Sequence, residues 1–350
     1  MRRRPAPLAA PLAVLLAALF AVVAVAGLPA AAADPGAPKP PVPDAVVGPA
    51  APRPGETVVS LTFDDGFKTQ EAAAEVLAGR GMPGTFYVNA GSLGYPAYLT
   101  VDQVRGIAAM GHEIGGHGLD HDRLTEMPPA AVRAQVCVDR ATLAALGLDV
   151  RSFAYPYGAV SEQVRQVVQD CGYSSARAAS GLWDSPTECD SCPRAEDPAT
   201  MDTWKIRTSG TATTPDLLRQ RVEQAEQAGG GWVPLVFHHV CTCPEKAEAG
   251  ISPGDFTAFV EWLAARPAGT RVATVAQVAG GDPRPVVGAP LQRIVAGPAA
   301  PASSRRVAFS VAGVQISQSN VIVAGLVVAT GALVAYRFGT RGKRYAGRKG

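Results

Sequence analysis

Short apolar runs alternate with amphipathic segments from about residue 58 to residue 274 of this chain. The runs are rich in β-branched and aromatic residues, which is typical of buried strands, and the segments between them have helical spacing. We expect strands at 58–63, 85–89, 113–116, 152–155, 232–237 and 271–274, and helices at 70–78, 102–110, 128–146, 161–171, 215–227 and 255–265. Repeated strand-then-helix units predict an α/β fold with a parallel sheet covered by helices, either an open doubly wound sheet or a closed barrel.

The two ends of the chain carry apolar runs that do not belong to this alternation. Arginines at positions 2–4 precede an Ala/Leu/Val run from Leu8 to Leu28, and small residues follow it, which is typical of a signal peptide or an N-terminal anchor. A second run, Val321 to Tyr336, is followed by six basic residues, as in a transmembrane helix whose basic tail stays in the cytoplasm. A run of this length also fits a buried or interfacial helix, but the basic tail favours the membrane. We therefore expect an exported, membrane-anchored protein at the cell surface.

Two proline-rich stretches, 35–54 and 283–301, have the composition of extended spacers and bracket one domain. The length of 350 residues, the 47% hydrophobic content and the net charge of +2 suit one globular domain with flexible flanks, and we expect no nucleic-acid partner. The expected segments are a signal peptide or anchor at 1–33, a linker at 34–54, the domain at 55–282, a second linker at 283–306, a juxtamembrane segment at 307–320, the membrane helix at 321–336 and a cytoplasmic tail at 337–350.

All six cysteines fall within the domain, and an even number of cysteines in an exported domain indicates disulfides. They are Cys137, Cys171, Cys189, Cys192, Cys241 and Cys243. Six cysteines allow fifteen pairings. Our hypothesis is a Cys137–Cys171 bridge, with the other four cysteines tying two loops together or closing small local rings. The alternative is that the CxxC and CxC pairs hold one zinc ion together, which disulfide formation in an oxidising compartment disfavours.

Two motifs with metal-binding residues follow predicted strands. Asp64 and Asp65 follow the first strand, and Gly66 allows the chain to turn there. Adjacent side chains diverge, so one carboxylate can bind a metal while the other faces a water molecule. The spacing of His117 and His121 lets both imidazoles reach one cation if the residues between them form a helical turn. Taken singly, the acidic pair also fits a solvated turn, and the histidines also fit capping or surface positions.

Two further motifs stand at strand ends. Arg151 precedes a strand and could fix a carboxylate, and the turn that contains Tyr157 could point a backbone N–H into a site. This piece alone also fits a structural aromatic turn. A late apolar strand delivers His238 and His239, of which His238 should lie nearest the strand end as a proton donor, while the other serves as a core residue. The carboxyl ends of parallel strands gather chemistry at one edge, so we expect these motifs to meet.

In this order, the TFDDG, GHEIGGHGLDH, RSFAYPYG and PLVFHHV segments resemble the polysaccharide deacetylase family, the NodB-type domain of carbohydrate esterase family 4. The resemblance covers about residues 55–280 and implies a distorted (β/α) barrel. It implies that a zinc-like divalent ion is held by Asp65, His117 and His121. It implies for catalysis Asp64 as base, His238 as acid with His239 as the alternative, the backbone N–H of Tyr157 at the oxyanion, and Arg151 as a supporting residue.

The chain departs from the family pattern in two places. Gly118 stands where the family usually has Ser or Thr, so a hydroxyl that fixes the loop is missing. The family's Asp-Trp segment, whose carboxylate partners the arginine, has no clean match; Asp202 with Trp204 is the nearest, and Asp184 after Trp183 the next. These departures put the tuning of His238 and Arg151 in question.

The resemblance predicts a metal-dependent hydrolase that removes N-acetyl groups from an extracellular or cell-wall polysaccharide. The alternatives are an O-acetyl polysaccharide esterase, since the same chemistry cleaves esters, and a catalytically weak glycan-binding surface protein. The expected partners are an acetylated glycan and the membrane, and the expected cofactor is a divalent metal, Zn²⁺ before others.

Overall fold

The computed structural model describes residues 51–185, 189–211, 213–243 and 250–295, and two further strands, β11 (Phe309–Val311) and β12 (Val314–Ile316). The predicted signal segment at 1–33 and the predicted transmembrane helix at 321–336 lie outside these residues. Within the part of the chain that is described, none of the helices combines the length and the apolar character that a membrane span requires.

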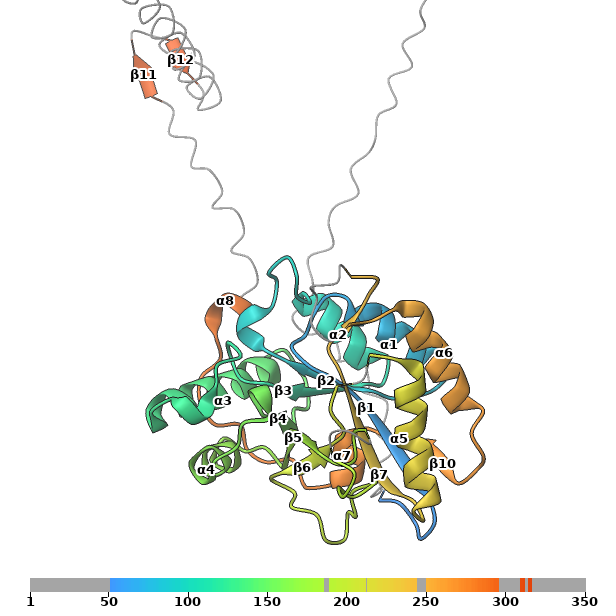
Figure 1. Ribbon diagram of the computed structural model, residues 1–350. Coiled ribbons are helices and arrows are strands. Elements are labelled where there is room, and N and C mark those ends of the chain that lie inside the picture. Colours follow the sequence, from blue (N-terminus) through green and yellow to red (C-terminus); the bar gives the residue numbers. More distant parts are fainter. Residues whose placement is uncertain are drawn as a thin grey trace, which may run out of the picture. The chain divides into compact units, whose positions relative to one another are not determined.

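The domain is built from a parallel sheet with helices packed around it (Figure 1). The strands of the sheet are β1 (Thr57–Phe63), β2 (Thr85–Val88), β3 (Glu113–Gly116), β4 (Ser152–Ala154), β5 (Ser175–Gly181), β6 (Ile206–Thr208), β7 (Gly231–Phe237) and β10 (Thr270–Val272), and β8 (His239–Val240) pairs separately with β9 (Gly250–Ile251). The α-helices are α1 (Gln70–Ala78), α2 (Val101–Ala109), α3 (Pro129–Ala145), α4 (Glu162–Asp170), α5 (Pro215–Gln227), α6 (Pro253–Ala264), α7 (Val275–Ala279) and α8 (Gln292–Val295). Three short 3₁₀ turns lie at Ala90–Ser92, Leu124–Glu126 and Pro156–Gly158.

Strand β1 is the centre of the sheet. All seven of its residues are buried, and it pairs in parallel with β10, β2 and β7. The register with β7 runs from Thr57 opposite Gly231 to Phe63 opposite Phe237. Phe63 stacks on Phe86 and Phe237, so the core continues to the last residue of β1. The residues that follow β1 and β7 are therefore held side by side at the carboxyl edge of the sheet.

The sheet follows the order β10-β1-β2-β3-β4-β5-β6, with β7 also paired to β1, and it curls. A parallel bridge between Thr211 and Val236, and the hydrogen bond from the Ser209 N–H to the Pro234 carbonyl (3.3 Å), connect the segment after β6 to β7. This curled parallel sheet with covering helices agrees with the (β/α) class predicted from the sequence. Two of its strands, β5 and β6, were not among the predicted ones.

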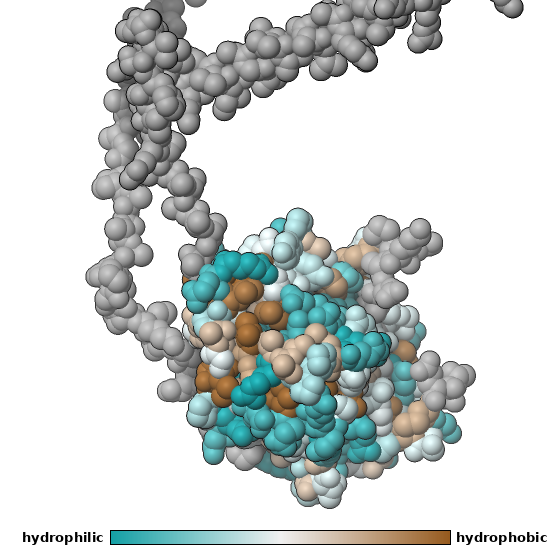
Figure 2. Space-filling view, turned by 90° about the vertical axis from the view of Figure 1, so that its left-hand side faces the viewer, coloured by the Kyte–Doolittle hydropathy of each residue, from teal (hydrophilic) through white to brown (hydrophobic). Residues whose placement is uncertain are grey.

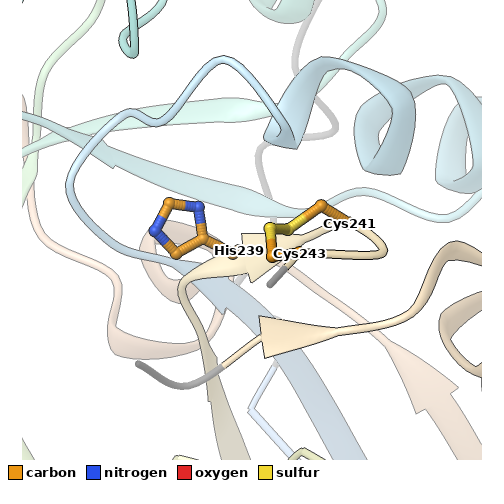
Figure 3. A group of neighbouring side chains, drawn as sticks. All are labelled: His239, Cys241 and Cys243. Atoms are coloured by element: carbon orange, nitrogen blue, oxygen red, sulfur yellow. A yellow bond between two sulfur atoms is a disulfide. The ribbon is translucent and has the colours of Figure 1, made fainter. Parts of the chain in front are cut away.

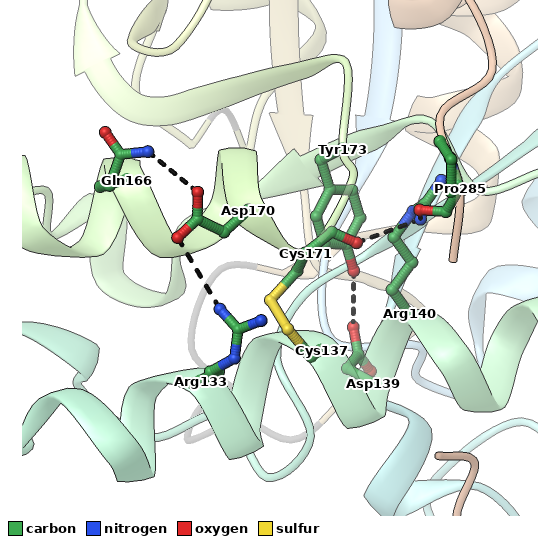
Figure 4. The surroundings of a disulfide bond; sticks show 9 residues. All are labelled: Arg133, Cys137, Asp139, Arg140, Gln166, Asp170, Cys171, Tyr173 and Pro285. Atoms are coloured by element: carbon green, nitrogen blue, oxygen red, sulfur yellow. Dashed lines mark hydrogen bonds and ion pairs between the residues drawn. A yellow bond between two sulfur atoms is a disulfide. The ribbon is translucent and has the colours of Figure 1, made fainter. Parts of the chain in front are cut away.

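The proline-rich segment after residue 282 is not an unpacked spacer as far as it is described. Arg140 of α3 is only 4% exposed, and its guanidinium donates to the carbonyls of Pro285 (2.9 Å) and Cys171 (3.1 Å) (Figure 4). It also donates to the carbonyl of Arg284 (2.9 Å). The Leu291 N–H donates to the hydroxyl of Thr142 (2.8 Å). The predicted domain boundary at 282 is therefore too early, because residues up to Val295 pack on α3.

The surface over α3, α4 and α8 is mostly hydrophilic, with smaller hydrophobic patches between (Figure 2). Large hydrophobic side chains that are exposed within the described residues are Tyr95, Met110, Tyr157 and Val286. Val286 belongs to the packed linker, so this segment keeps part of its apolar surface in solvent.

Three disulfides lie within the described residues. Cys137–Cys171 joins α3 to the end of α4, as hypothesised, and both residues are buried (Figure 4). Cys189–Cys192 and Cys241–Cys243 close small local rings, which was one of the two arrangements considered for them. In this structure each pair is joined internally, so the four cysteines do not hold one zinc ion together.

Candidate metal and catalytic site

The acidic pair after β1 is divided between two environments. Asp65 has a positive φ of 76° and Gly66 one of 70°, so the chain turns sharply as it leaves the sheet. The turn directs the Asp64 side chain, which is 4% exposed, into the domain and the Asp65 side chain, which is 13% exposed, toward the histidines after β3. The predicted divergence of the two carboxylates is present.

Three predicted metal ligands meet at this edge. Oδ1 of Asp65 lies 3.4 Å from Nε2 of His117 and 3.2 Å from Nε2 of His121. One ligand atom from each residue lies within 4.8 Å of the other two, and Oδ1 of Asp65 is buried without a hydrogen-bond partner. A carboxylate oxygen and two imidazole nitrogens that converge in this way fit a three-ligand site for Zn²⁺ or a similar divalent ion, with positions left for water.

His117 is held in the orientation that a ligand needs. Its Nδ1 lies 2.7 Å from the carbonyl oxygen of Ala154, so Nδ1 carries the proton and Nε2 presents its lone pair toward Asp65. The amide of Asn89 donates to the carbonyls of His117 (2.7 Å) and Gly118 (2.8 Å). The chain that follows β3 is thereby fixed on both sides of the first histidine.

The predicted helical turn between the two histidines is wrong. Residues 117–121 form an irregular loop, in which Gly118 (φ 80°) and His121 (φ 60°) adopt left-handed conformations. Two reversals of backbone direction bring His121 back beside His117, with ring centroids 4.9 Å apart. The spacing of four serves the same purpose as on a helix, but a loop achieves it.

A buried carboxyl takes the place of the hydroxyl that is missing at Gly118. Asp139 is fully buried and accepts hydrogen bonds from the N–H groups of Gly118 and Ala90 (2.9 Å for Ala90) and from the hydroxyl of Tyr173 (3.2 Å). Burial raises the pKa of Asp139 to about 7, although these donors act in the opposite direction. Asp139 on one side and Asn89 on the other therefore fix the histidine loop.

The electrostatics of the cluster suit cation binding. Burial alone would raise the pKa of Asp65, but contact with His117 and the charges of the histidines lower it to about 2. Burial opposes protonation of His117, yet the charges of Asp64 and Asp65 raise its pKa overall. Burial and the charge of His117 lower the pKa of His121. The cluster thus presents an ionised carboxylate and a second imidazole that stays neutral more readily.

The arginine that pairs with Asp64 is Arg177 of β5, which the sequence did not suggest. The two side chains form an ion pair in which Arg177 is fully buried and Asp64 4% exposed. The guanidinium also lies over the ring of Tyr87, 4.5 Å from its centroid. The only signal in the sequence is a single arginine within a run of small residues.

The predicted pair of Arg151 and Asp202 does not form. Arg151 makes an ion pair with the exposed Asp149, with Nε 2.7 Å from Oδ2. Asp202 pairs with Arg165 of α4 (3.1 Å). The next alternative, Asp184, makes an ion pair with Arg221 of α5. Arg151 sits before β4, at the amino end of a strand, which places it away from the edge that holds the ligands.

Tyr157 is exposed and lies next to His121 of the cluster. Its φ of 59° turns the Pro156–Gly158 segment sharply, and its ring centroid lies 4.5 Å from that of His121. The ring is 56% exposed, with the guanidinium of Arg123 4.4 Å from its centroid. Its position beside a candidate ligand is consistent with the predicted role of its backbone N–H, which stays a prediction.

The two late histidines have different surroundings. His238 directly follows β7, its Nδ1 is buried without a hydrogen-bond partner, and its charge acts on both Asp65 and His121. His239 begins β8 and stacks on Phe67, with centroids 3.8 Å apart. The side chain of Gln70 donates to the carbonyls of Asp64 and His238 (2.9 Å for His238), which ties the two strand ends together. The charge of Asp65 also acts on the pKa of His239, so the unpartnered Nδ1 of His238 and the stacking of His239 are what favour His238 as the acid.

Comparison with known proteins agrees with the motifs. Residues 51–176 match the family model described as polysaccharide deacetylase, the family that the motifs indicated. An uncharacterized protein of Streptomyces coelicolor is 32% identical over 168 residues, which cover 48% of this chain and 62% of that protein. A candidate polysaccharide deacetylase of Bacillus subtilis, YxkH, is 27% identical over 123 residues, which cover 35% of this chain and 44% of that protein. The matches thus span less than two thirds of either relative. His238 and Arg177 lie beyond residues 51–176, the segment that the family model matches.

Solved structures with a similar course of the chain include the Xyl-CE4 domain of a multidomain xylanase from the hindgut metagenome of Trinervitermes trinervoides. It is 19% identical, with a TM-score of 0.44, over 66% of this chain and 95% of that one. A structure described as T48 deacetylase with substrate is 22% identical, with a TM-score of 0.43, over 67% of this chain and 96% of that one. At these identities and scores the likeness supports no inference about activity.

Proposed function

We propose that this chain is a metal-dependent hydrolase that removes N-acetyl groups from an extracellular or cell-wall polysaccharide. The observation that carries the proposal is the meeting of His117 and His121 with the buried, unpartnered Oδ1 of Asp65. Asp64, the neighbour of Asp65 in the chain, is paired with the buried Arg177. The match of residues 51–176 to the polysaccharide deacetylase family model supports the same chemistry.

The first step of the proposed reaction, attack of water on the acetamide carbonyl, involves the metal ligands and Asp64. A divalent ion bound by Asp65, His117 and His121 would lower the pKa of a water molecule and polarise the carbonyl group of the substrate. Asp64, oriented by Arg177, accepts the proton of the attacking water.

His238 donates a proton to the departing amine nitrogen, and the backbone N–H of Tyr157 donates to the carbonyl oxygen as negative charge builds up on it. His238 takes this role because its buried Nδ1 has no hydrogen-bond partner within the described residues, whereas the ring of His239 stacks on Phe67. Acetate and a free amino sugar are the products.

The test is acetate release by the full-length chain from N-acetylated chitin oligomers, peptidoglycan and acetylated xylan, with and without a chelator. We expect release from an N-acetylated glycan that the chelator abolishes and added Zn²⁺ restores, and a loss of about 100-fold or more in Asp64→Asn. Asp149→Asn changes an exposed carboxylate of the same type and should retain wild-type activity.

The outcomes separate the alternatives. Release from acetylated xylan alone would indicate an O-acetyl esterase, and binding of a glycan without release would indicate a glycan-binding surface protein. Equal activity of Asp64→Asn and wild type would refute the mechanism. Comparing His238→Ala with His239→Ala identifies the acid, and we expect only the former to lose about 100-fold or more.

We further propose that the domain is exported and held at the cell surface by the C-terminal segment. Three disulfides within the described residues support this location, since disulfides persist in oxidising compartments. Protease treatment of intact cells should cleave the domain and spare a tag at the C-terminus. Protection of the domain until the cells are lysed would contradict the proposal.

A further inference from the structure

A second group of metal-binding residue types lies just after His238, and the hydrolase mechanism does not use it. His239, Cys241 and Cys243 stand at alternate positions along the chain. In an extended chain, residues at this spacing project from the same face. His239 begins β8, and the Cys241 N–H donates to the carbonyl of Ile251 (2.9 Å), so β8 remains paired with the β9 segment up to Cys241.

The three side chains lie close together (Figure 3). One ring nitrogen of His239 and the sulfurs of Cys241 and Cys243 lie within 4.8 Å of one another. The sulfurs are joined in a disulfide, and in that state they are not thiolate ligands. One imidazole and two thiolates form a set that zinc and its softer relative cadmium bind well, unlike the carboxylate and two imidazoles of the first cluster.

We propose that His239, Cys241 and Cys243 form a second, redox-gated site for a thiophilic divalent cation. A dithiol reductant supplies two electrons and two protons, which break the Cys241–Cys243 bond and yield two thiols and the oxidised, cyclic disulfide of the reductant. Binding of the cation then releases the two thiol protons to solvent, and a ring nitrogen of neutral His239 completes a three-ligand set. The open position of a tetrahedral ion is taken by water.

The surroundings allow this disulfide to be opened without unfolding the domain. Cys241 and Cys243 are partly exposed, whereas Cys137 and Cys171 are only 3% and 0% exposed. A link between residues two apart closes a much smaller loop than one between residues 34 apart, so it constrains the unfolded chain far less. The small loop therefore contributes little to stability, and its reduction should leave the fold intact.

His239 is already held in place for this role. Its ring stacks on Phe67 at 3.8 Å between centroids, and Nδ1 lies 3.4 Å from the hydroxyl of Thr69. These contacts fix the imidazole next to the sulfurs, so little freedom is lost when a cation binds. Phe67, which stacks on His239, is two residues from Asp65 in the chain. A cation bound to His239 would therefore act, through this ring contact, on a residue close to the first cluster.

The test uses Cd²⁺ as the probe, because cadmium bound to thiolates absorbs in the ultraviolet by charge transfer and cadmium bound only to oxygen and nitrogen does not. The full-length chain with Cys189→Ser/Cys192→Ser is the parent, which removes the other accessible pair. After treatment with a dithiol and its removal without oxygen, we expect one Cd²⁺ per chain to produce the thiolate band. The same protein left oxidised should show no band.

Two comparisons identify the ligands. The reduced Cys241→Ser/Cys243→Ser chain, which keeps Cys189 and Cys192, should bind Cd²⁺ through thiolates at least tenfold more weakly than the parent. His239→Ala in the parent should also weaken binding at least tenfold, and it keeps both cysteines if the serine variant does not fold. Circular dichroism and an intact Cys137–Cys171 bond verify the fold of each chain.

The proposal fails if the reduced parent shows no thiolate band, or if the parent and the reduced Cys241→Ser/Cys243→Ser chain bind Cd²⁺ equally. It also fails if His239→Ala binds Cd²⁺ as tightly as the parent. None of these measurements uses acetate release, so the second site is tested independently of the proposed hydrolase activity.

Discussion

The buried pair of Asp64 and Arg177 offers the sharpest test of the site. We consider Arg177→Met, which keeps an unbranched side chain of similar length against Tyr87 and removes the charge. The fully buried Arg177 then no longer balances Asp64, whose side chain is 4% exposed. Removal of one partner from a buried ion pair costs about 3–5 kcal/mol in unfolding free energy, because the other charge stays buried without compensation.

Arg151→Met is the matched control, because the sequence alone suggested Arg151 for the same role. Its side chain is 25% exposed and its partner Asp149 is 62% exposed. Ion pairs in such solvent-accessible positions contribute about 0–1 kcal/mol. The structure therefore predicts that Arg177→Met is the more damaging change for both stability and acetate release, and that Arg151→Met stays close to wild type.

The assay is urea unfolding of the full-length chain in detergent, with tryptophan fluorescence as the signal that reports unfolding. All four tryptophans lie between residues 183 and 262, so the signal reports on this domain. Asp64→Asn/Arg177→Met should lose less stability than Arg177→Met alone, since no carboxylate is left uncompensated. The reasoning is refuted if Arg177→Met lies within about 1 kcal/mol of Arg151→Met, or if the Asp64→Asn background does not reduce its effect.

Three further changes test the surroundings of the site by the same unfolding assay. The pKa of Asp139 is raised to about 7, so the folded chain keeps a proton that the unfolded chain loses above about pH 4. The unfolding free energy should therefore fall by up to about 4 kcal/mol as the pH rises from about 4 to about 7. Asp139→Asn should remove this dependence between about pH 5 and 8. Gly118→Ser should destabilise the chain by about 1 kcal/mol, because φ is 80° there, whereas a gain in stability would contradict this account. A chain ending at Asp282 should be about 2–4 kcal/mol less stable than one ending at Val295, because Arg140 loses two carbonyl acceptors; equal stabilities would show that the linker contributes nothing.

The sequence predicted much of the sheet because most strands are apolar, β-branched runs that end in polar residues. Strand β5 was missed, and its composition explains why: Ser175–Gly181 contains only small residues and Arg177, which have low β-propensity. Its conformation is imposed by pairing with β4 and β6 rather than by local preference. Since Arg177 is found only once this strand is recognised, the missed strand and the missed partner of Asp64 are one error.

The meeting of the three candidate ligands was predictable for a different reason. Asp65, His117 and His121 are residue types that are costly to bury without a purpose, and they stand within five residues of the ends of strands that must meet in a parallel sheet. The ion pairs of Arg151 and Asp202 depend instead on which side chains meet across the fold, and spacing along the chain carries no such information.

Gly118 shows how a departure from a family pattern is compensated. A hydroxyl at this position would fix the loop locally, but a side chain there would have to adopt the left-handed conformation that brings His121 beside His117. With glycine the turn is free of that strain, and the loop is fixed from outside, by the amide of Asn89 on its carbonyls and the carboxyl of Asp139 on its N–H. The rigidity that a ligand loop needs is thus supplied by residues from other elements, and the absent hydroxyl is no argument against a metal site.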